Sequence, residues 1–181
     1  MKLVEIILIV FTIIGLIFKL MHLPLAGLIL TISLMSLAMF YGISVIYKVA
    51  TSVGNNTLSQ TAKNSIPLSV VSSMFLGILI IGILFKLMFW PMSGIMLLFG
   101  IMGTTVIFIV TLILFFTKKD LKPFCKELLI RVGSWLFVGI LLYSTSTETL
   151  IKIQYRDDPE LARLIINANK TFDEKDFAEI R

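Results

Sequence analysis

Ionisable residues are scarce in this chain. Of its 181 residues, 15% are charged, one is a histidine and one is a cysteine. Soluble domains have about 25% charged residues, so the composition argues against that class. The lone Cys125 cannot form an internal disulfide, and the lone His22 cannot supply a cluster of histidine metal ligands. The sequence also has no nucleophile–base arrangement, phosphate-binding loop or zinc motif, so we expect a protein that is not an enzyme and uses no metal or cofactor.

Apolar residues take the place of the missing charges. Hydrophobic residues make up 57% of the chain, and the mean hydropathy is +0.99. A hydrocarbon core of about 30 Å requires about 20 helical residues, and five apolar runs are long enough to be candidates. They are Leu3–Leu20, Ala26–Tyr47, Leu68–Met88, Met92–Phe116 and Leu128–Thr145. We therefore predict an all-α membrane protein with five transmembrane helices and membrane lipids as partners. The net charge of +5 then reflects topology rather than binding to nucleic acid.

Part of the sequence is repeated. The segment 13–27 reads IIGLIFKLMHLPLAG, and the segment 80–94 reads IIGILFKLMFWPMSG. Shared hydrophobicity does not explain a lone lysine and a lone proline at equal positions in both segments. Each proline cannot continue the incoming helix but suits the first turn of the outgoing one. The pattern predicts two transmembrane helical hairpins, 1–47 and 68–116, which point the same way and are related by an axis normal to the membrane. A parallel repeat disfavours an alternating-access transporter, because many of these are built from inverted repeats.

The basic residues predict the orientation of the chain. Short loops rich in Lys and Arg stay in the cytoplasm, and the loop 117–127 contains Lys118, Lys119, Lys122 and Lys126. We therefore expect a cytoplasmic amino terminus, cytoplasmic loops at 48–67 and 117–127, a fifth span at 128–145 and a helical tail at 146–181 outside the cytoplasm. The expected location is the bacterial inner membrane. If 128–145 lay along the membrane surface instead, the tail would be cytoplasmic.

The tail carries signals of helix starts. Thr145–Glu148 and Thr171–Glu174 have capping-box spacing, and Asp158 precedes Pro159 as an acidic cap would. After this third start, four apolar residues fall on one helical face, which is expected to pack on this protein's helices, on the membrane surface or on a partner. They are Leu161, Leu164, Ile165 and Ala168.

The two repeated lysines are the first candidates for a structural or partner-contact role. Lys19 and Lys86 lie near the ends of apolar runs, shortly before Pro24 and Pro91. One interpretation places them inside the bundle, bound to an anion or to a partner's carboxylate. The other lets each ammonium extend to the outer lipid headgroups. Their duplication favours a shared structural task, such as donating to the carbonyls that the prolines leave without an N–H donor.

Three further residues complete the set of candidates. His22 and Trp90 lie at the predicted hairpin tips, where a tryptophan is usually an interfacial anchor. Arg131 lies one turn inside the fifth apolar run, and we expect it to extend to the cytoplasmic headgroups.

The hairpin tips resemble those of the GldL family, the inner-membrane component of the gliding-motility and type IX secretion motor. The family pattern is Gly-x-x-Phe-Lys-x-Met-His-Trp-Pro-Gly-Ala. The first tip matches at Gly15, Phe18, Lys19, Met21, His22 and Pro24, and the second at Gly82, Phe85, Lys86, Met88, Trp90 and Pro91. The resemblance implies a shared hairpin scaffold. The family's motor glutamate, in the second helix of the hairpin, is replaced by Leu37 and Thr104, and the family's long cytoplasmic domain has no counterpart in this sequence.

Three functions are compatible with these features. The first is a non-enzymatic inner-membrane subunit, a structural or accessory component of a larger complex that packs with other membrane subunits or with copies of itself. The second is a GldL-like motor or ion channel that uses partner carboxylates. The third is a small transporter, which the parallel repeat and the scarcity of polar residues within the runs disfavour.

Overall fold

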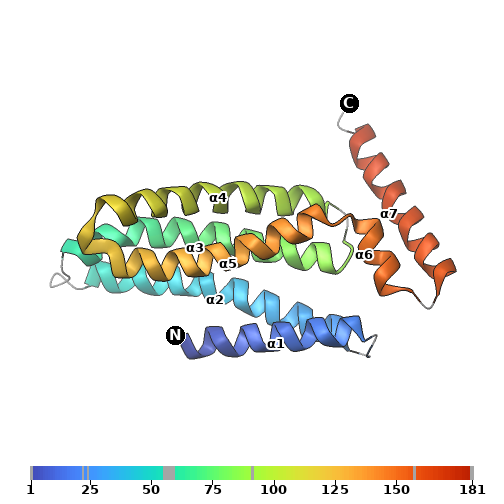
Figure 1. Cartoon of the computed structure of the whole chain (residues 1–181), viewed down its shortest axis with the longest axis horizontal. Coiled ribbons are helices and arrows are strands. Elements are labelled where there is room, and N and C mark those ends of the chain that lie inside the picture. The colour runs from blue at the N-terminus through green and yellow to red at the C-terminus, as the bar shows by residue number, and fades with distance from the viewer. Residues whose placement is uncertain are drawn as a thin grey trace.

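The computed structural model of the chain describes residues 2–21, 23, 25–54, 60–90, 92–156 and 158–179, apart from the side chains of residues 2, 48, 51–54, 60–64 and 171–179. These residues form helices and no strand (Figure 1). The helices are α1 (Lys2–Leu20), α2 (Ala26–Gly54), α3 (Gln60–Leu87), α4 (Ser93–Thr117), the short 3-10 helix η1 (Lys119–Leu121), α5 (Lys122–Ser144), α6 (Thr147–Gln154) and α7 (Pro159–Glu179). The expected all-α class is confirmed.

Helices α1 to α5 run side by side, each reversed relative to the one before it (Figure 1). Packing follows the chain, since α1 lies on α2, α2 on α3, and α3 on α4, while α5 covers both α4 and α3. The α1–α2 and α3–α4 turns lie at the same end of the bundle, and α6 and α7 lie there too. The bundle therefore brings both copies of the repeated tip next to the carboxy-terminal helices.

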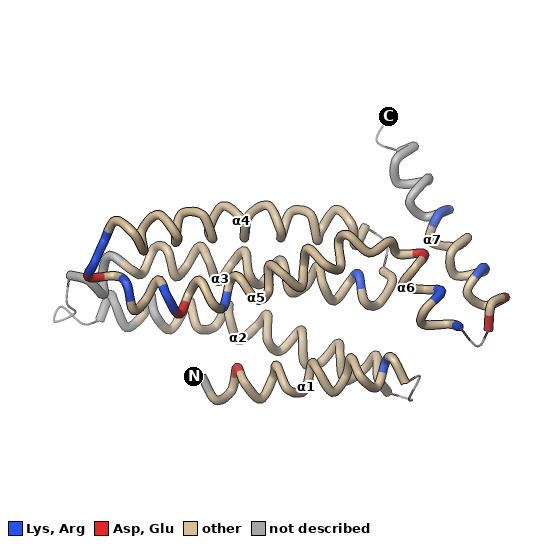
Figure 2. Tube along the Cα trace, viewed as in Figure 1, with Lys and Arg blue, Asp and Glu red and all other residues tan. Residues whose placement is uncertain are grey.

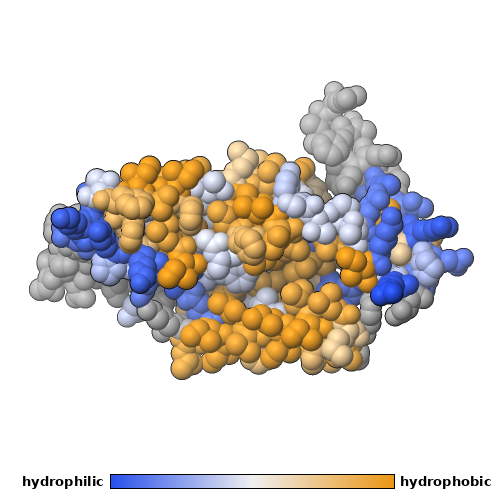
Figure 3. All heavy atoms as spheres, viewed as in Figure 1, coloured by the Kyte–Doolittle hydropathy of each residue, from blue (hydrophilic) through white to orange (hydrophobic). Residues whose placement is uncertain are grey.

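Among the residues that the structure describes, four helices are long and apolar enough to cross a membrane, which is the pattern of a multi-pass membrane protein. They are Leu3–Leu20, Ala26–Tyr47, Ser65–Leu87 and Ser93–Thr117. A fifth candidate consists of Lys119–Ser144 together with Thr147–Gln154, two helices that meet at an angle of 88°. Figure 3 shows apolar surface along the middle of the bundle and hydrophilic surface towards both ends. Figure 2 shows lysines and arginines at the α4–α5 turn and on α6 and α7.

The core lies between α2 and α3. Leu30, Leu34 and Leu37 of α2 are fully buried against Leu79 and Ile80 of α3, together with further residues of α3, α4 and α5. By contrast, only 17% of the first candidate span is buried. The first helix is therefore held on one side, and its other sides are apolar surface.

Glycines bring α3 and α4 into close contact. A Cβ atom on Gly82 would lie 2.8 Å from the Leu97 Cα atom, and one on Gly100 would lie 2.6 Å from the Leu79 Cα atom. Both distances are shorter than carbon atoms tolerate, and small residues allow this approach between membrane helices.

Two predicted loops are partly helical. The segment 48–67 was expected to be a solvated loop, but α2 continues to Gly54 and α3 begins at Gln60, with 55–59 outside the described residues. The segment 117–127 contains η1 and the first turns of α5, which begins at Lys122. Hydropathy marks where apolar residues end, whereas a helix continues as long as its backbone bonds are made.

The helix starts of the tail are partly as predicted. Asp158 caps α7, because its Oδ1 atom accepts from the Leu161 N–H at 3.0 Å. At α6 the cap is Ser146, which accepts from the Thr149 N–H at 3.3 Å. The capping box predicted at Thr145 is therefore wrong by one residue, since the Thr145 hydroxyl donates to the Leu141 carbonyl at the end of α5. Helix α7 runs through Thr171 without interruption, so the start predicted there is also wrong.

The buried face of α7 differs from the predicted stripe. Ala162 and Ile166 are buried with Ile151 of α6, and Phe89 at the α3–α4 tip packs against them. Leu161 and Leu164 are instead 40% and 66% exposed. Ile165 of the predicted stripe also packs against this cluster. The tail therefore packs on this protein's own helices, through a face that shares Ile165 with the predicted one and otherwise uses Ala162 and Ile166.

Candidate functional site

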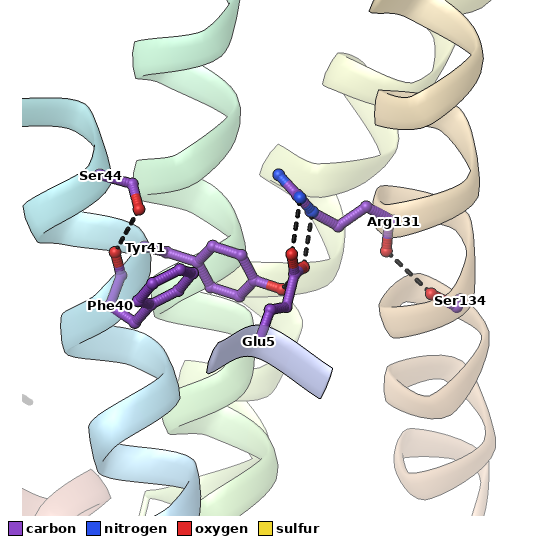
Figure 4. Close-up of polar contacts among 6 residues, drawn as sticks. All are labelled: Glu5, Phe40, Tyr41, Ser44, Arg131 and Ser134. Carbon is purple, nitrogen blue, oxygen red and sulfur yellow. Dashed lines mark hydrogen bonds and ion pairs between the residues drawn. The ribbon is translucent and has the colours of Figure 1, made fainter. Parts of the chain in front are cut away.

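An ion pair joins α1 to α5 within the bundle. The guanidinium of Arg131 donates through Nη2 to Glu5 Oε2 at 2.7 Å, and its Nε atom lies 2.7 Å from Glu5 Oε1 (Figure 4). The pair is therefore bidentate, the strongest arrangement of these two groups. The side chains of Arg131 and Glu5 are 30% and 12% exposed.

Helix α2 contributes a third group to this pair. The Tyr41 hydroxyl donates to Glu5 Oε1 at 2.6 Å, and the Arg131 guanidinium carbon lies 5.6 Å from the centre of the Tyr41 ring. Helices α1, α2 and α5 are thus joined by charge-assisted contacts. Because two charges neutralise each other here, removal of either one would leave the other unpaired in an apolar environment.

Arg131 makes a contact that the sequence analysis did not predict. We expected its side chain to extend to the cytoplasmic headgroups, but it points between the helices to Glu5 (Figure 4). Glu5 itself was not among the candidates. The sequence contained a signal for this pair, because Glu5 and Arg131 have opposite charges and each lies about one turn inside an apolar run that is predicted to begin on the same side of the membrane.

A cavity of about 190 Å³ with both polar and apolar walls lies on one side of the ion pair, between α1, α2, α3 and α5. It is lined by Glu5, Phe40, Tyr41, Ser44, Ser69, Ser72, Ser73, Leu76, Phe124, Glu127, Leu128 and Arg131. The hydroxyl of Ser44 donates to the Phe40 carbonyl at 2.7 Å, and that of Ser72 donates to the Ser69 carbonyl at 3.0 Å. Their oxygens can therefore accept hydrogen bonds from the contents of the cavity. The sequence analysis missed this cavity. The spacing of Ser69, Ser72 and Ser73 places them on one face of α3 and could have indicated a polar surface there.

An open groove of about 310 Å³ lies between α1 and α5. It is lined by Glu5, Ile6 and Ile9 of α1 and by Glu127, Ile130, Arg131, Ser134 and Trp135 of α5. Groove and cavity share Glu5, Glu127 and Arg131. The ion pair thus stands where an apolar groove at the surface meets a hydroxyl-lined cavity inside.

At the other end of the bundle, Lys19 connects the two hairpins. Its ammonium donates to the Leu87 carbonyl at the end of α3 and lies 3.8 Å from the Met88 sulfur and 4.8 Å from the centre of the Phe89 ring. Leu87 is four residues before Pro91, and proline has no N–H with which to continue the helix. A lysine that donates to a carbonyl left free by proline is one of the roles expected from the sequence.

Lys86 makes a different contact, although it is equivalent to Lys19 in the repeat. It is buried, with 6% of its surface exposed, and its ammonium donates to the Thr147 hydroxyl at 2.9 Å. Gln154 of α6 donates to the Lys19 carbonyl at 3.4 Å, so α6 contacts both tips. Both ammonium groups thus donate to atoms of another helix of this chain.

The remaining sequence candidates lie at the tips. Trp90 is 43% exposed, and its ring meets that of Phe85 edge to face at 4.8 Å. His22, Pro24 and Pro91 lie outside the described residues.

The two tips have the same backbone geometry where both are described. The bonds from Met21 N to Ile17 O, Leu23 N to Phe18 O and Ile29 N to Leu25 O correspond to those from Met88 N to Leu84 O, Trp90 N to Phe85 O and Met96 N to Met92 O. Leu25 and Met92 occupy equivalent positions with φ angles of 68° and 60°, which non-glycine residues seldom adopt. The sequence repeat is therefore accompanied by the same local turn.

The positions that the family resemblance gives to a glutamate are interior. Leu37 is fully buried and Thr104 is 1% exposed. The Thr104 hydroxyl oxygen has no hydrogen-bond partner. Neither position supplies a carboxylate to the bundle.

Other chemistry is limited in the part of the chain that the structure describes. There, no group of three His, Cys, Asp or Glu side chains is placed to hold a metal ion. Cys125 is a free, buried thiol on α5. Comparisons with protein-family models, with curated proteins and with solved structures found no match.

Proposed function

We propose that this chain is a non-enzymatic integral inner-membrane subunit that serves as a structural or accessory component of a larger membrane complex. The observation that carries the proposal is the use of its interior charges. Glu5 and Arg131 bind each other, Lys19 binds a carbonyl of α3, and Lys86 binds the hydroxyl of Thr147 on α6. These contacts join helices to one another, as expected of groups that stabilise an assembly.

The exposed face of α1 supports a partner. This helix is buried on one side only, and apolar side chains cover the rest of it, among them Ile6, Ile13 and Ile17 at 59%, 52% and 47% exposure. Association of membrane helices depends on packing between such faces. A partner helix, or α1 of a second copy, fits this surface.

The finer architecture belongs to the same proposal. In it, α1–α2 and α3–α4 are parallel copies of one hairpin, α5 is the fifth span, the amino terminus is cytoplasmic and α7 is outside. The matching hydrogen bonds of the two tips support the duplication. The lysine-rich α4–α5 turn supports the orientation, because basic loops remain in the cytoplasm. A GldL-like motor is less well supported, because the interior positions 37 and 104 carry no carboxylate.

Purification of the full chain from native membranes in a mild detergent tests the function. We expect another integral membrane protein to co-purify in a fixed ratio, and we expect substitution of Ile13 and Ile17 by alanine to reduce its recovery. Substitution of Met39, which is 63% exposed on α2, is the control. Recovery of the chain alone as a monomer would contradict the proposal, and a homo-oligomer that conducts ions would favour the motor.

A further inference from the structure

The cavity beside the ion pair brings hydroxyl groups together inside an otherwise apolar bundle. Ser69, Ser72 and Ser73 of α3 and Ser44 of α2 all line it, and each of these residues is at least nine-tenths buried. Buried hydroxyl groups require hydrogen-bond partners, because their transfer out of water is otherwise unfavourable. The contents of the cavity must therefore be able to form hydrogen bonds.

The lining offers both donors and acceptors. The hydroxyl of Ser73 makes no hydrogen bond among the residues that the structure describes, so it can donate and accept. The hydroxyls of Ser44 and Ser72 donate to backbone carbonyls, so each can still accept. An acyl chain in the cavity would leave these atoms without partners, whereas water would supply them. A cavity of about 190 Å³ has room for several waters.

The lining extends from the surface of the bundle to its interior. Glu127 is exposed and Phe124 is half-buried, whereas Leu76 is 1% exposed. Phe124 and Leu128 lie in the first two turns of α5, which begins at the α4–α5 turn (Figure 1). Helix α1 begins part-way along the bundle, short of that turn, and contributes only Glu5 to the lining. The cavity therefore opens towards the lysine-rich end of the bundle (Figure 2).

The inner end of the cavity is closed by the apolar core. Tyr41 of α2 and Leu76 of α3 are the last lining residues in this direction. About one turn further along the two helices, Leu37 and Leu79 are fully buried in the core. Because protein interiors are closely packed, side chains rather than water occupy the space between the helices there. The cavity is therefore open at one end and blind at the other.

We propose that this cavity is a water-filled vestibule, which opens to the aqueous phase at the α4–α5 turn and admits small hydrophilic molecules as far as Ser73. A guanidinium has five N–H donors, and the Glu5 carboxylate takes two of those of Arg131. Water in the vestibule supplies acceptors for the others, so that the ion pair is hydrated on the side of the cavity. This inference does not depend on the proposed function, because the cavity is formed within a single chain.

Cysteine labelling of the full chain in native membrane vesicles tests the proposal. In a Cys125→Ala background, Ser73→Cys is treated with a small, membrane-impermeant methanethiosulfonate that is added to one side at a time. We expect it to react at least tenfold faster than Ser33→Cys, a control at a serine of α2 that is 3% exposed and is not part of the lining. The reaction should occur only from the side on which Lys119→Cys, in the α4–α5 turn, is labelled.

The rate and the side of labelling test different parts of the proposal. If Ser73→Cys reacts as slowly as Ser33→Cys, the cavity is not hydrated and the proposal is wrong. Labelling from both sides, or only from the side opposite to Lys119→Cys, would contradict the blind inner end. Because Lys119→Cys defines the side, the result does not depend on which side is cytoplasmic. If Ser73→Cys fails to fold, Ser44→Cys tests the same cavity from α2.

A variant that fills the cavity locates the reagent. Ser73→Leu replaces a hydroxyl of the lining by a larger apolar side chain, and we expect it to slow the labelling of Ser44→Cys at least tenfold. Met39→Leu, at a residue of α2 that is 63% exposed outside the lining, is expected to leave this labelling unchanged. Equally fast labelling in both variants would show that the reagent reaches Ser44→Cys by another route, and would overturn the vestibule.

Discussion

The Glu5 carboxylate and the Arg131 guanidinium lie 126 residues apart in sequence and are joined by a 2.7 Å hydrogen bond. They can meet because α1 and α5 run in the same direction along the bundle (Figure 1). The Tyr41 hydroxyl donates to the same carboxylate. These three side chains thus fix the position of α1, whose other packing is chiefly on α2.

Removal of either charge alone should destabilise the protein more than removal of both. We expect Glu5→Gln and Arg131→Met each to lower the apparent unfolding temperature, with a cost of about 3–5 kcal/mol for a charge left unpaired in the interior. The double variant should recover most of this loss. Thermal unfolding of the detergent-purified variants provides the double-mutant cycle, with Lys126→Met, at an exposed residue of α5, as the control. Additive losses would show that the two groups do not interact.

The glycines between α3 and α4 give a second prediction. Gly100→Ala should destabilise the bundle, because the new methyl group would lie 2.6 Å from the Leu79 Cα atom and force the two backbones apart. Gly42→Ala in α2 is the matched control, since nothing lies within 4 Å of the position that its Cβ atom would take. We expect a cost of about 1–3 kcal/mol for Gly100→Ala, as for overpacking, and no loss for Gly42→Ala. Equal unfolding temperatures for the two variants would contradict the close approach.

The orientation can be tested independently of stability. A reporter enzyme fused after Arg181 should be active only outside the cytoplasm, and a cysteine introduced at Lys119 should be protected from reagents added outside. This expectation follows from the basic α4–α5 turn and from α5 as a fifth span. Cytoplasmic activity of the carboxy-terminal fusion would mean that α5 and α6, which meet at 88°, do not cross the membrane.

The sequence predicted the long helices well because each is an apolar run bounded by polar residues. The bounds of Leu3–Leu20 and Ala26–Tyr47 agree with α1 and with the start of α2. Helix extension beyond Tyr47 was missed, since polar residues in a helix that leaves the membrane give no hydropathy signal. The predicted helix ends therefore coincide with the ends of the apolar runs, whereas the observed helix ends are set by the backbone hydrogen bonds.

The candidate site was predicted less well, because its parts come from distant helices. Repetition identified Lys19 and Lys86, but their partners differ, since Lys19 contacts the second hairpin and Lys86 contacts α6. Equivalent residues of the two repeated tips can have different neighbours, because α5 and α6 pack differently on the two hairpins. Glu5 can pair with Arg131 only because α1 and α5 are neighbours in the fold. The periodicity of a single segment does not tell which helices will be neighbours.

The two lysines provide the last prediction, which separates a structural subunit from a motor. Lys19→Met removes the donor to the Leu87 carbonyl, and an unpaired buried polar group costs about 1–3 kcal/mol. Lys86→Met removes the donor to Thr147. We expect the double variant to show reduced abundance in the membrane, measured by immunoblot, because the contacts between the hairpins and α6 are lost.

Proton transport should be absent from the wild type as well. Transfer of a proton across about 30 Å of hydrocarbon requires titratable groups or water along the path. The residues at positions 37 and 104 are leucine and threonine, and Glu5 is held by Arg131 in a bidentate pair. The purified chain in liposomes is therefore expected to leave an imposed proton gradient intact. Proton flux through the wild type, lost in the double lysine variant at unchanged abundance, would instead assign these lysines to a motor.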